Sequence, residues 1–191
     1  MSYLRGFIPW IAFAALSTVG WQWGALAGLV IGVRLLMQDR KAGVATDALI
    51  LQFSTVVYFA ALTAFAFAAP HSPVEHYDGA VSFAWLALTA WGTLAATRPF
   101  TLGIAKQQAP KEVWGSPVFL RINVVLTAAW ATAFTLTAAA VAACDAAHLG
   151  SLATTGCQVA GFVVPAVFTA RYPKAVQARL AATATPVTAA R

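Results

Sequence analysis

The chain has 191 residues, of which 60% are hydrophobic and 9% are charged, and its formal net charge is +6. A soluble domain usually carries about 25% charged residues, so this chain cannot cover a globular surface with groups that water solvates. Because apolar stretches recur along its whole length, the composition excludes a soluble domain with a single anchor and predicts an integral membrane protein.

The first apolar stretch, Phe7 to Val33, is too long for one crossing. A helix needs roughly 20 residues to cross a hydrocarbon core of about 30 Å. We therefore expect two short helices, at about Leu4–Thr18 and Trp21–Gln38, joined near Gly20. In the alternative, the stretch is a single helix or is partly re-entrant, which gives five membrane segments and places the N-terminus outside.

Four glycines in this region are spaced four residues apart: Gly20, Gly24, Gly28 and Gly32. Residues at i and i+4 share one face of a helix. Inside a bilayer, small residues on one face let two helix backbones approach closely. The pattern, a glycine zipper, predicts tight packing against a neighbouring helix of the same chain or, alternatively, against a second copy in a homodimer.

Four more nearly uncharged stretches follow, at Ala48–Ala69, Gly79–Thr97, Ile122–Ala143 and about Cys157–Ala170. With the N-terminal pair they predict an all-α, polytopic transmembrane helix bundle of about six membrane segments, the first two of them short. We expect the bundle to occupy residues 1–172 and a flexible basic tail to occupy residues 173–191.

Lysine and arginine are distributed unevenly among the connections between these segments. Arg40 and Lys41 fall in one connection, several basic residues fall in another at 98–121, and more fall at the C-terminal end, whereas the stretches 71–78 and 145–156 contain none. The positive-inside rule then places the basic connections and both termini in the cytoplasm. The predicted location is the bacterial inner membrane.

The connector at 98–121 is the most distinctive part of the predicted cytoplasmic side. It mixes lysines with apolar residues and a tryptophan, which is typical of a segment lying in the membrane interface and attracted to anionic lipid headgroups. We single out a candidate docking surface or gate there: Arg98, Pro99, Lys106, Trp114, Arg121 and Asn123. A simple connector with snorkelling lysines is the alternative.

Catalytic motifs are missing from the sequence. It contains no HExxH motif, no phosphate-binding glycine loop and no nucleophile elbow, so we expect a non-enzymatic protein without a cofactor. His71 and His76 lie near Glu75 and Asp78 in the segment PHSPVEHYDG. Imidazole and carboxylate suit zinc, but the prolines favour a solvated turn, and we predict no metal site.

Two cysteines, Cys144 and Cys157, bracket the second outer loop. In an oxidising compartment a disulfide between them would close that loop. Alanine-rich membrane helices also accept cysteine as a small apolar residue, so two free thiols are the alternative interpretation.

Residues 97–134 resemble the intracellular septation protein A family of small bacterial inner-membrane proteins. The likeness lies in a basic residue and proline at a helix end, a Gly/Lys-containing segment, a tryptophan, an asparagine and a Trp-xxx-Phe helix. The matching residues are Arg98, Pro99, Gly103, Lys106, Trp114, Asn123, Trp130 and Phe134. The N-terminal FIPWIAFA resembles the family's opening helix, and the alanine and valine bias also suits an actinobacterial-type relative. The resemblance implies a role in septation or envelope maintenance through other membrane proteins, and it supplies no catalytic residues.

Two functional hypotheses follow. The first is a non-enzymatic envelope protein that acts by helix packing and by binding envelope or division proteins, with no nucleic acid among its partners. The second is a small transporter or channel for a neutral or anionic solute. A water-accessible polar cavity at the level of Gln52, Asn123 and Gln158 favours the second hypothesis, whereas a dry, closed bundle favours the first.

Overall fold

The computed structural model describes residues 5–183, and all regular structure in that range is helical. The α-helices are α2 (Ile8–Leu16), α3 (Trp21–Lys41), α4 (Ile50–Ala68), α5 (Asp78–Ala95), α6 (Phe100–Lys106), α7 (Pro117–Ala146) and α8 (Ser151–Thr183). Three short 3-10 helices connect them, namely η1 (Thr46–Leu49), η2 (Pro73–Tyr77) and η3 (Lys111–Val113). The predicted all-helical bundle is confirmed.

Three of these helical segments are long and apolar enough to cross a membrane: Thr46–Ala68, Pro117–Ala146 and Ser151–Ala182. A fourth crossing follows if the segment Pro73–Ala95 and α6, which meet at a bend of 77°, form one broken span. Helix α2 has only 9 residues, and the last turns of α3 carry Asp39, Arg40 and Lys41. The total of six crossings therefore stays a prediction.

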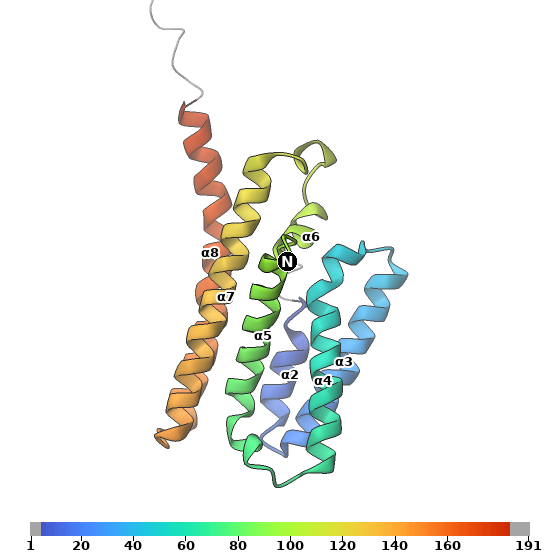
Figure 1. Ribbon diagram of the computed structural model, residues 1–191, viewed down its shortest axis with the longest axis vertical. Coiled ribbons are helices and arrows are strands. Elements are labelled where there is room, and N and C mark those ends of the chain that lie inside the picture. Colours follow the sequence, from blue (N-terminus) through green and yellow to red (C-terminus); the bar gives the residue numbers. More distant parts are fainter. Residues whose placement is uncertain (1–4, 184–191) are drawn as a thin grey trace, which may run out of the picture.

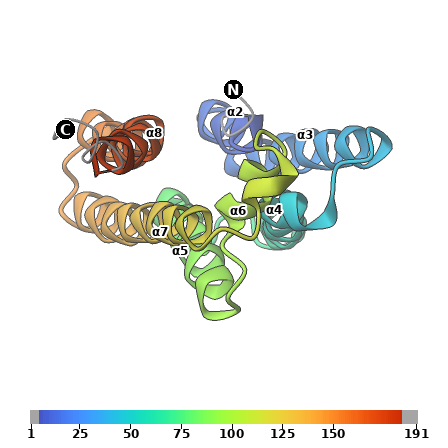
Figure 2. The same ribbon diagram turned by 90° about the horizontal axis from the view of Figure 1, so that it is seen from above.

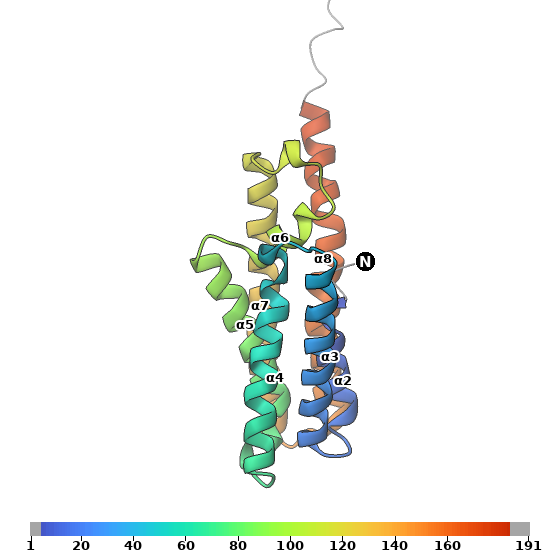
Figure 3. The ribbon, with the colours of Figure 1, turned by 90° about the vertical axis from the view of Figure 1, so that its right-hand side faces the viewer.

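The long helices run side by side along one axis (Figures 1 and 3). The connections α3–α4 and α5–α7 lie toward one end of the bundle, and the connections α4–α5 and α7–α8 lie at the other. We call these the basic end and the acidic end, because the alternation of charge predicted from the sequence follows this division. Which end faces the cytoplasm stays a prediction.

The chain forms two groups of helices. Helix α3 packs against α2 and α4, while α7 packs against α5 and α8. Viewed along the bundle, α3 and α4 lie on one side and α7 and α8 on the other, with α5 and α6 between them (Figure 2). The short helix α6 packs against both η1 and α7, so it connects the two groups at the basic end.

The break between α2 and α3 lies where the glycine pattern predicts it. Ser17 and Thr18 donate side-chain hydrogen bonds to carbonyls of the preceding turn, at 2.8 and 3.0 Å, in competition with continued helix. Gly20 then caps α3. The N-terminal stretch is therefore a helical hairpin, as the two-helix interpretation predicts.

Three of the four spaced glycines lie at close contacts between helices of the same chain. A methyl group on Gly24 would meet Ser17 and Phe13 of the preceding helix and turn, and one on Gly28 would overlap the ring of Phe59 in α4. Gly32 lies in looser contact with α2 and α4, whereas Gly20 contacts only side chains of its own helix, α3. Packing within the chain accounts for the glycine face, and contact with a second copy stays a prediction.

The C-terminal part differs from the expected tail. Helix α8 continues without interruption through Pro173 and ends at Thr183, so residues 173–183 are helical rather than irregular. Four of the eleven residues in this segment are alanine, the strongest helix former. The rest of the predicted tail, residues 184–191, lies outside the described residues.

Candidate functional site

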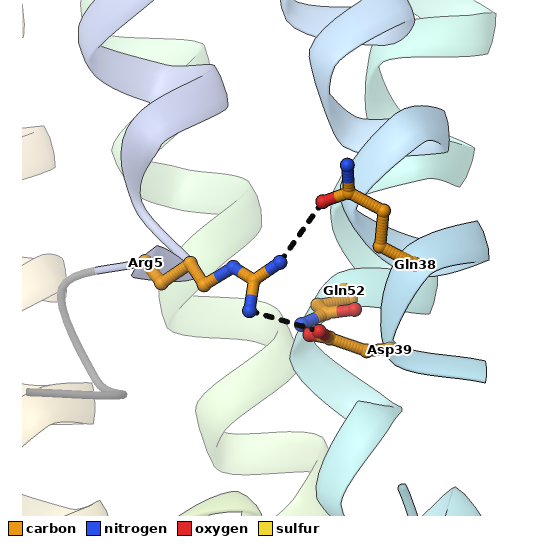
Figure 4. Close-up of polar contacts among 4 residues, drawn as sticks. All are labelled: Arg5, Gln38, Asp39 and Gln52. Carbon is orange, nitrogen blue, oxygen red and sulfur yellow. Dashed lines mark hydrogen bonds and ion pairs between the residues drawn. The ribbon is translucent and has the colours of Figure 1, made fainter. Parts of the chain in front are cut away.

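At the basic end, an ionic and amide network joins the first residues described to the end of α3 and the start of α4 (Figure 4). The Arg5 guanidinium lies 3.1 Å from the Asp39 carboxylate and donates a hydrogen bond of 3.0 Å to the Gln38 side-chain carbonyl. The Gln52 amide donates to the second oxygen of Asp39 at 2.6 Å. Asp39 is thus held from two sides, and its side chain is only 14% exposed.

This network lines a cavity of about 210 Å³. Its walls include Arg5, Asp39, Gln52 and Gln107, together with apolar residues of η1 and α6. The side-chain oxygen of Gln52 is buried and has no hydrogen-bond partner. A buried acceptor without a partner loses the free energy of its bond to water, so this cavity offers one acceptor and the spare donors of Arg5 to a small polar solute.

The sequence pattern did not predict that Arg5, Gln38 and Asp39 form one group. The predicted basic connection includes Arg40 and Lys41, which directly follow Asp39 in the chain. The signal was present, because a hairpin that turns at Gly20 brings the start of its first helix next to the end of its second. Arg5 and Asp39 are the opposite charges at those two positions.

The predicted docking residues are partly gathered at the junction of α5 and α6. Arg98, Pro99 and Lys106 line a groove of about 220 Å³ together with Asp47 of η1. Lys106 lies 3.1 Å from the Asp47 carboxylate, and its ammonium also lies 5.6 Å from the centre of the Trp114 ring. Asp47 thus pairs with a nearby cation.

The bend that forms this groove has a local cause. Thr97 adopts a left-handed backbone with φ of 57°, and Pro99 disfavours helical geometry at the residue before it. After the bend, Gly103 touches the backbone of Asp47 so closely that a methyl group there would overlap the carbonyl. Glycine is thus required for α6 to lie directly on η1.

The remaining predicted docking residues separate. Arg121 is exposed on α7, whereas Asn123 is only 1% exposed. Thr101 donates a hydrogen bond to the Asn123 main-chain carbonyl at 2.9 Å, and the Asn123 amide donates to the carbonyl of Phe119. Asn123 therefore belongs to the packing between α6 and α7 and does not lie on a docking surface.

The centre of the bundle is filled by aromatic rings. Phe7 stacks on Trp130 with ring centres 5.2 Å apart and meets the edge of Phe162 at 5.0 Å. Between α4 and α5, the hydroxyl groups of Tyr58 and Ser82 share a hydrogen bond of 2.8 Å. The cavities reached by Gln52 and by Gln158 therefore lie on opposite sides of a packed centre, and Asn123 lines neither of them.

The acidic end brings together residues from two loops. Among residues 5–183 no group of three or more His, Cys, Asp or Glu side chains is placed to hold a metal ion. His76 bonds the carbonyl of Asp145 at 3.1 Å, and its ring centre lies 5.7 Å from that of His148. Cys144 of α7 and Cys157 of α8 are free thiols that lie close to each other on packed helices.

No family model, no curated protein and no solved structure matches this chain. The resemblance to the septation protein A family therefore stays a prediction carried by the residues between 97 and 134.

Proposed function

We propose that this protein is a non-enzymatic, multi-pass protein of the bacterial inner membrane that supports septation or envelope maintenance by binding other membrane proteins. The observation that carries the proposal is the fixed connector at the basic end. Gly103 and the Lys106–Asp47 ion pair hold α6 on η1, so the connector is a formed surface on which a partner can dock with little ordering cost.

The composition of that surface suits a protein partner beside anionic lipid. Arg98, Lys111 and Arg121 are exposed, and they are accompanied by the exposed apolar side chains of Val118 and Leu120. Basic residues hold such a surface near anionic headgroups, while apolar side chains beside them supply contact area to a partner helix.

The proposal is tested by photo-crosslinking in the bacterium that encodes the chain. A crosslinker at Val113, beside Trp114 in the connector, should capture division or wall-synthesis proteins, while one at Val164, an exposed residue of α8, should not. Loss of the gene should lengthen cells or misplace septa. Normal cells together with identical capture from both positions would overturn the proposal.

A second function, transport of a small neutral or anionic solute, is supported by the cavity at Arg5 and Gln52. Under this alternative the packed aromatic centre must open during transport. Gln52→Cys in a cysteine-free background should then react with an impermeant thiol reagent from both sides of the membrane. Reaction from one side only would favour the closed, partner-binding protein.

A further inference from the structure

A second cavity lies at the acidic end, between α2, α5 and α8, and has a volume of about 110 Å³. Four aromatic side chains line it: Trp10 and Phe13 from α2, Phe83 from α5 and Phe162 from α8. Three of them are almost fully buried, so the walls are fixed by packing rather than by a mobile surface. We call this cavity the aromatic pocket.

The polar residues that line the aromatic pocket are Ser17, Asp78, Ser82 and Gln158. The hydroxyl of Ser82 is already bonded to Tyr58, so it contributes little to a ligand. Asp78, the first residue of α5, is the one charged residue in the lining, and neither of the two ion pairs found within residues 5–183 involves it.

Asp78 lies among other ionisable side chains of the acidic end. The ionisable side chains that act on it electrostatically are Glu75, Asp145 and His76, two of which are carboxylates. Arg5 and Lys106, both of which form ion pairs, lie at the basic end of the bundle. A cluster of one sign beside low-dielectric walls concentrates ions of the opposite sign.

This combination discriminates between classes of ligand. An anion would meet the carboxylates, and a neutral apolar molecule would leave the Asp78 carboxylate without a counter-charge beside aromatic walls, at a cost in desolvation. An ammonium group meets a carboxylate and also the negative faces of aromatic rings, which attract cations. The volume of the aromatic pocket is several times the roughly 30 Å³ that one water molecule occupies in the liquid, which suits a small organic cation.

We propose that the aromatic pocket binds a small alkylated ammonium ion, held between the rings of Trp10, Phe13 and Phe162 and the carboxylate of Asp78. This site lies at the end opposite the connector and is independent of the partner surface proposed above. It gives the protein a ligand at its acidic end.

The test uses the purified full chain in lipid nanodiscs and isothermal titration calorimetry. Tetramethylammonium is the probe, and tert-butanol is its neutral counterpart of similar shape. We expect saturable binding of tetramethylammonium and much weaker binding of tert-butanol. Equal affinity for the two, or no saturable binding of the cation, would overturn the proposal.

Two variants with matched controls locate the site. Asp78→Asn should weaken tetramethylammonium binding about tenfold or more, whereas Glu112→Gln, which alters an exposed carboxylate of η3 at the basic end, should change it less than about threefold. Phe162→Leu should weaken binding about five- to thirtyfold through loss of a ring face. Phe168→Leu, on the same helix but outside the pocket lining, is its control. If Asp78→Asn does not fold, the phenylalanine pair decides alone, and equal affinities within it would contradict the proposal.

Discussion

The guanidinium of Arg5 lies 3.1 Å from the carboxylate of Asp39, so the beginning of the N-terminal hairpin is tied to its end. Arg5 is 45% exposed at its side chain while Asp39 is 14% exposed, so the pair lies at the margin of the bundle rather than in its interior. The same carboxylate accepts a hydrogen bond from Gln52 of α4. Asp39 is therefore the point at which three segments of the chain meet.

Replacing Asp39 by Asn should destabilise the protein by about 1–2 kcal/mol. This value lies between the 0.2–1 kcal/mol of exposed pairs and the 3–5 kcal/mol lost when a buried pair is broken. Unfolding in mixed detergent micelles measures the change. Glu112→Gln, which alters an exposed carboxylate of η3, is the control and should change stability by less than about 0.5 kcal/mol. A double-mutant cycle with Arg5→Gln should give a coupling energy, and a value of zero would contradict the role of the pair.

Replacing Gly103 by Ala should cost about 1–3 kcal/mol, because the new methyl group overlaps the main chain of Asp47 and the backbones must separate. Gly92→Ala in α5 makes the same chemical change where a methyl group meets no atom within 4 Å, so it should cause no loss. Thermal unfolding of both variants gives the comparison. Equal stability of the two proteins would show that α6 does not lie as closely on η1 as described.

Cysteine crosslinking separates packing within the chain from a homodimer. In a background without Cys144 and Cys157, a cysteine at Ala25 should give no dimer, because Ala25 is 0% exposed beside the glycine face. A cysteine at Val30, which is 58% exposed on the same helix, reports any copy that approaches the outer face. A strong dimer from the Ala25 position in native membranes would show that the glycine face is open to a second copy.

Oxidation of the purified protein should join Cys144 to Cys157, because the two thiols lie close to each other on α7 and α8. The reaction removes two protons and two electrons, which an added disulfide oxidant accepts. Labelling with a maleimide polymer before and after reduction counts the free thiols. The variant Cys157→Ser is the control, and a disulfide between two chains in place of the internal one would contradict this proximity.

The sequence predicted those features that depend on local pattern. The hairpin at Gly20, the order of the long helices and the segregation of charge between connections all follow from hydropathy and from the positions of glycine and charge. What the sequence did not supply depends on contacts between distant segments. Nothing local marks Asp78 as the wall of an aromatic pocket, because that depends on which helices become neighbours.

The C-terminal boundary depends on a different property. A short run of small residues with scattered charge indicates weak burial, from which the sequence predicts a flexible tail. Helix α8 instead continues to Thr183 although its apolar span is only 11% buried within the protein. Helical backbone satisfies its own hydrogen bonds, so it does not need a neighbouring surface to persist beside lipid.

The placement of α6 bears on how the chain is assembled during synthesis. The group α2–α3–α4 precedes α5, α7 and α8 in the sequence, and its helices pack mainly against one another. Helix α6 belongs to the later half but lies on η1 of the earlier half. Its docking therefore completes a joint between two halves that a ribosome delivers one after the other. Two fragments divided in the loop at 69–72 and made as separate polypeptides should recognise each other through this joint.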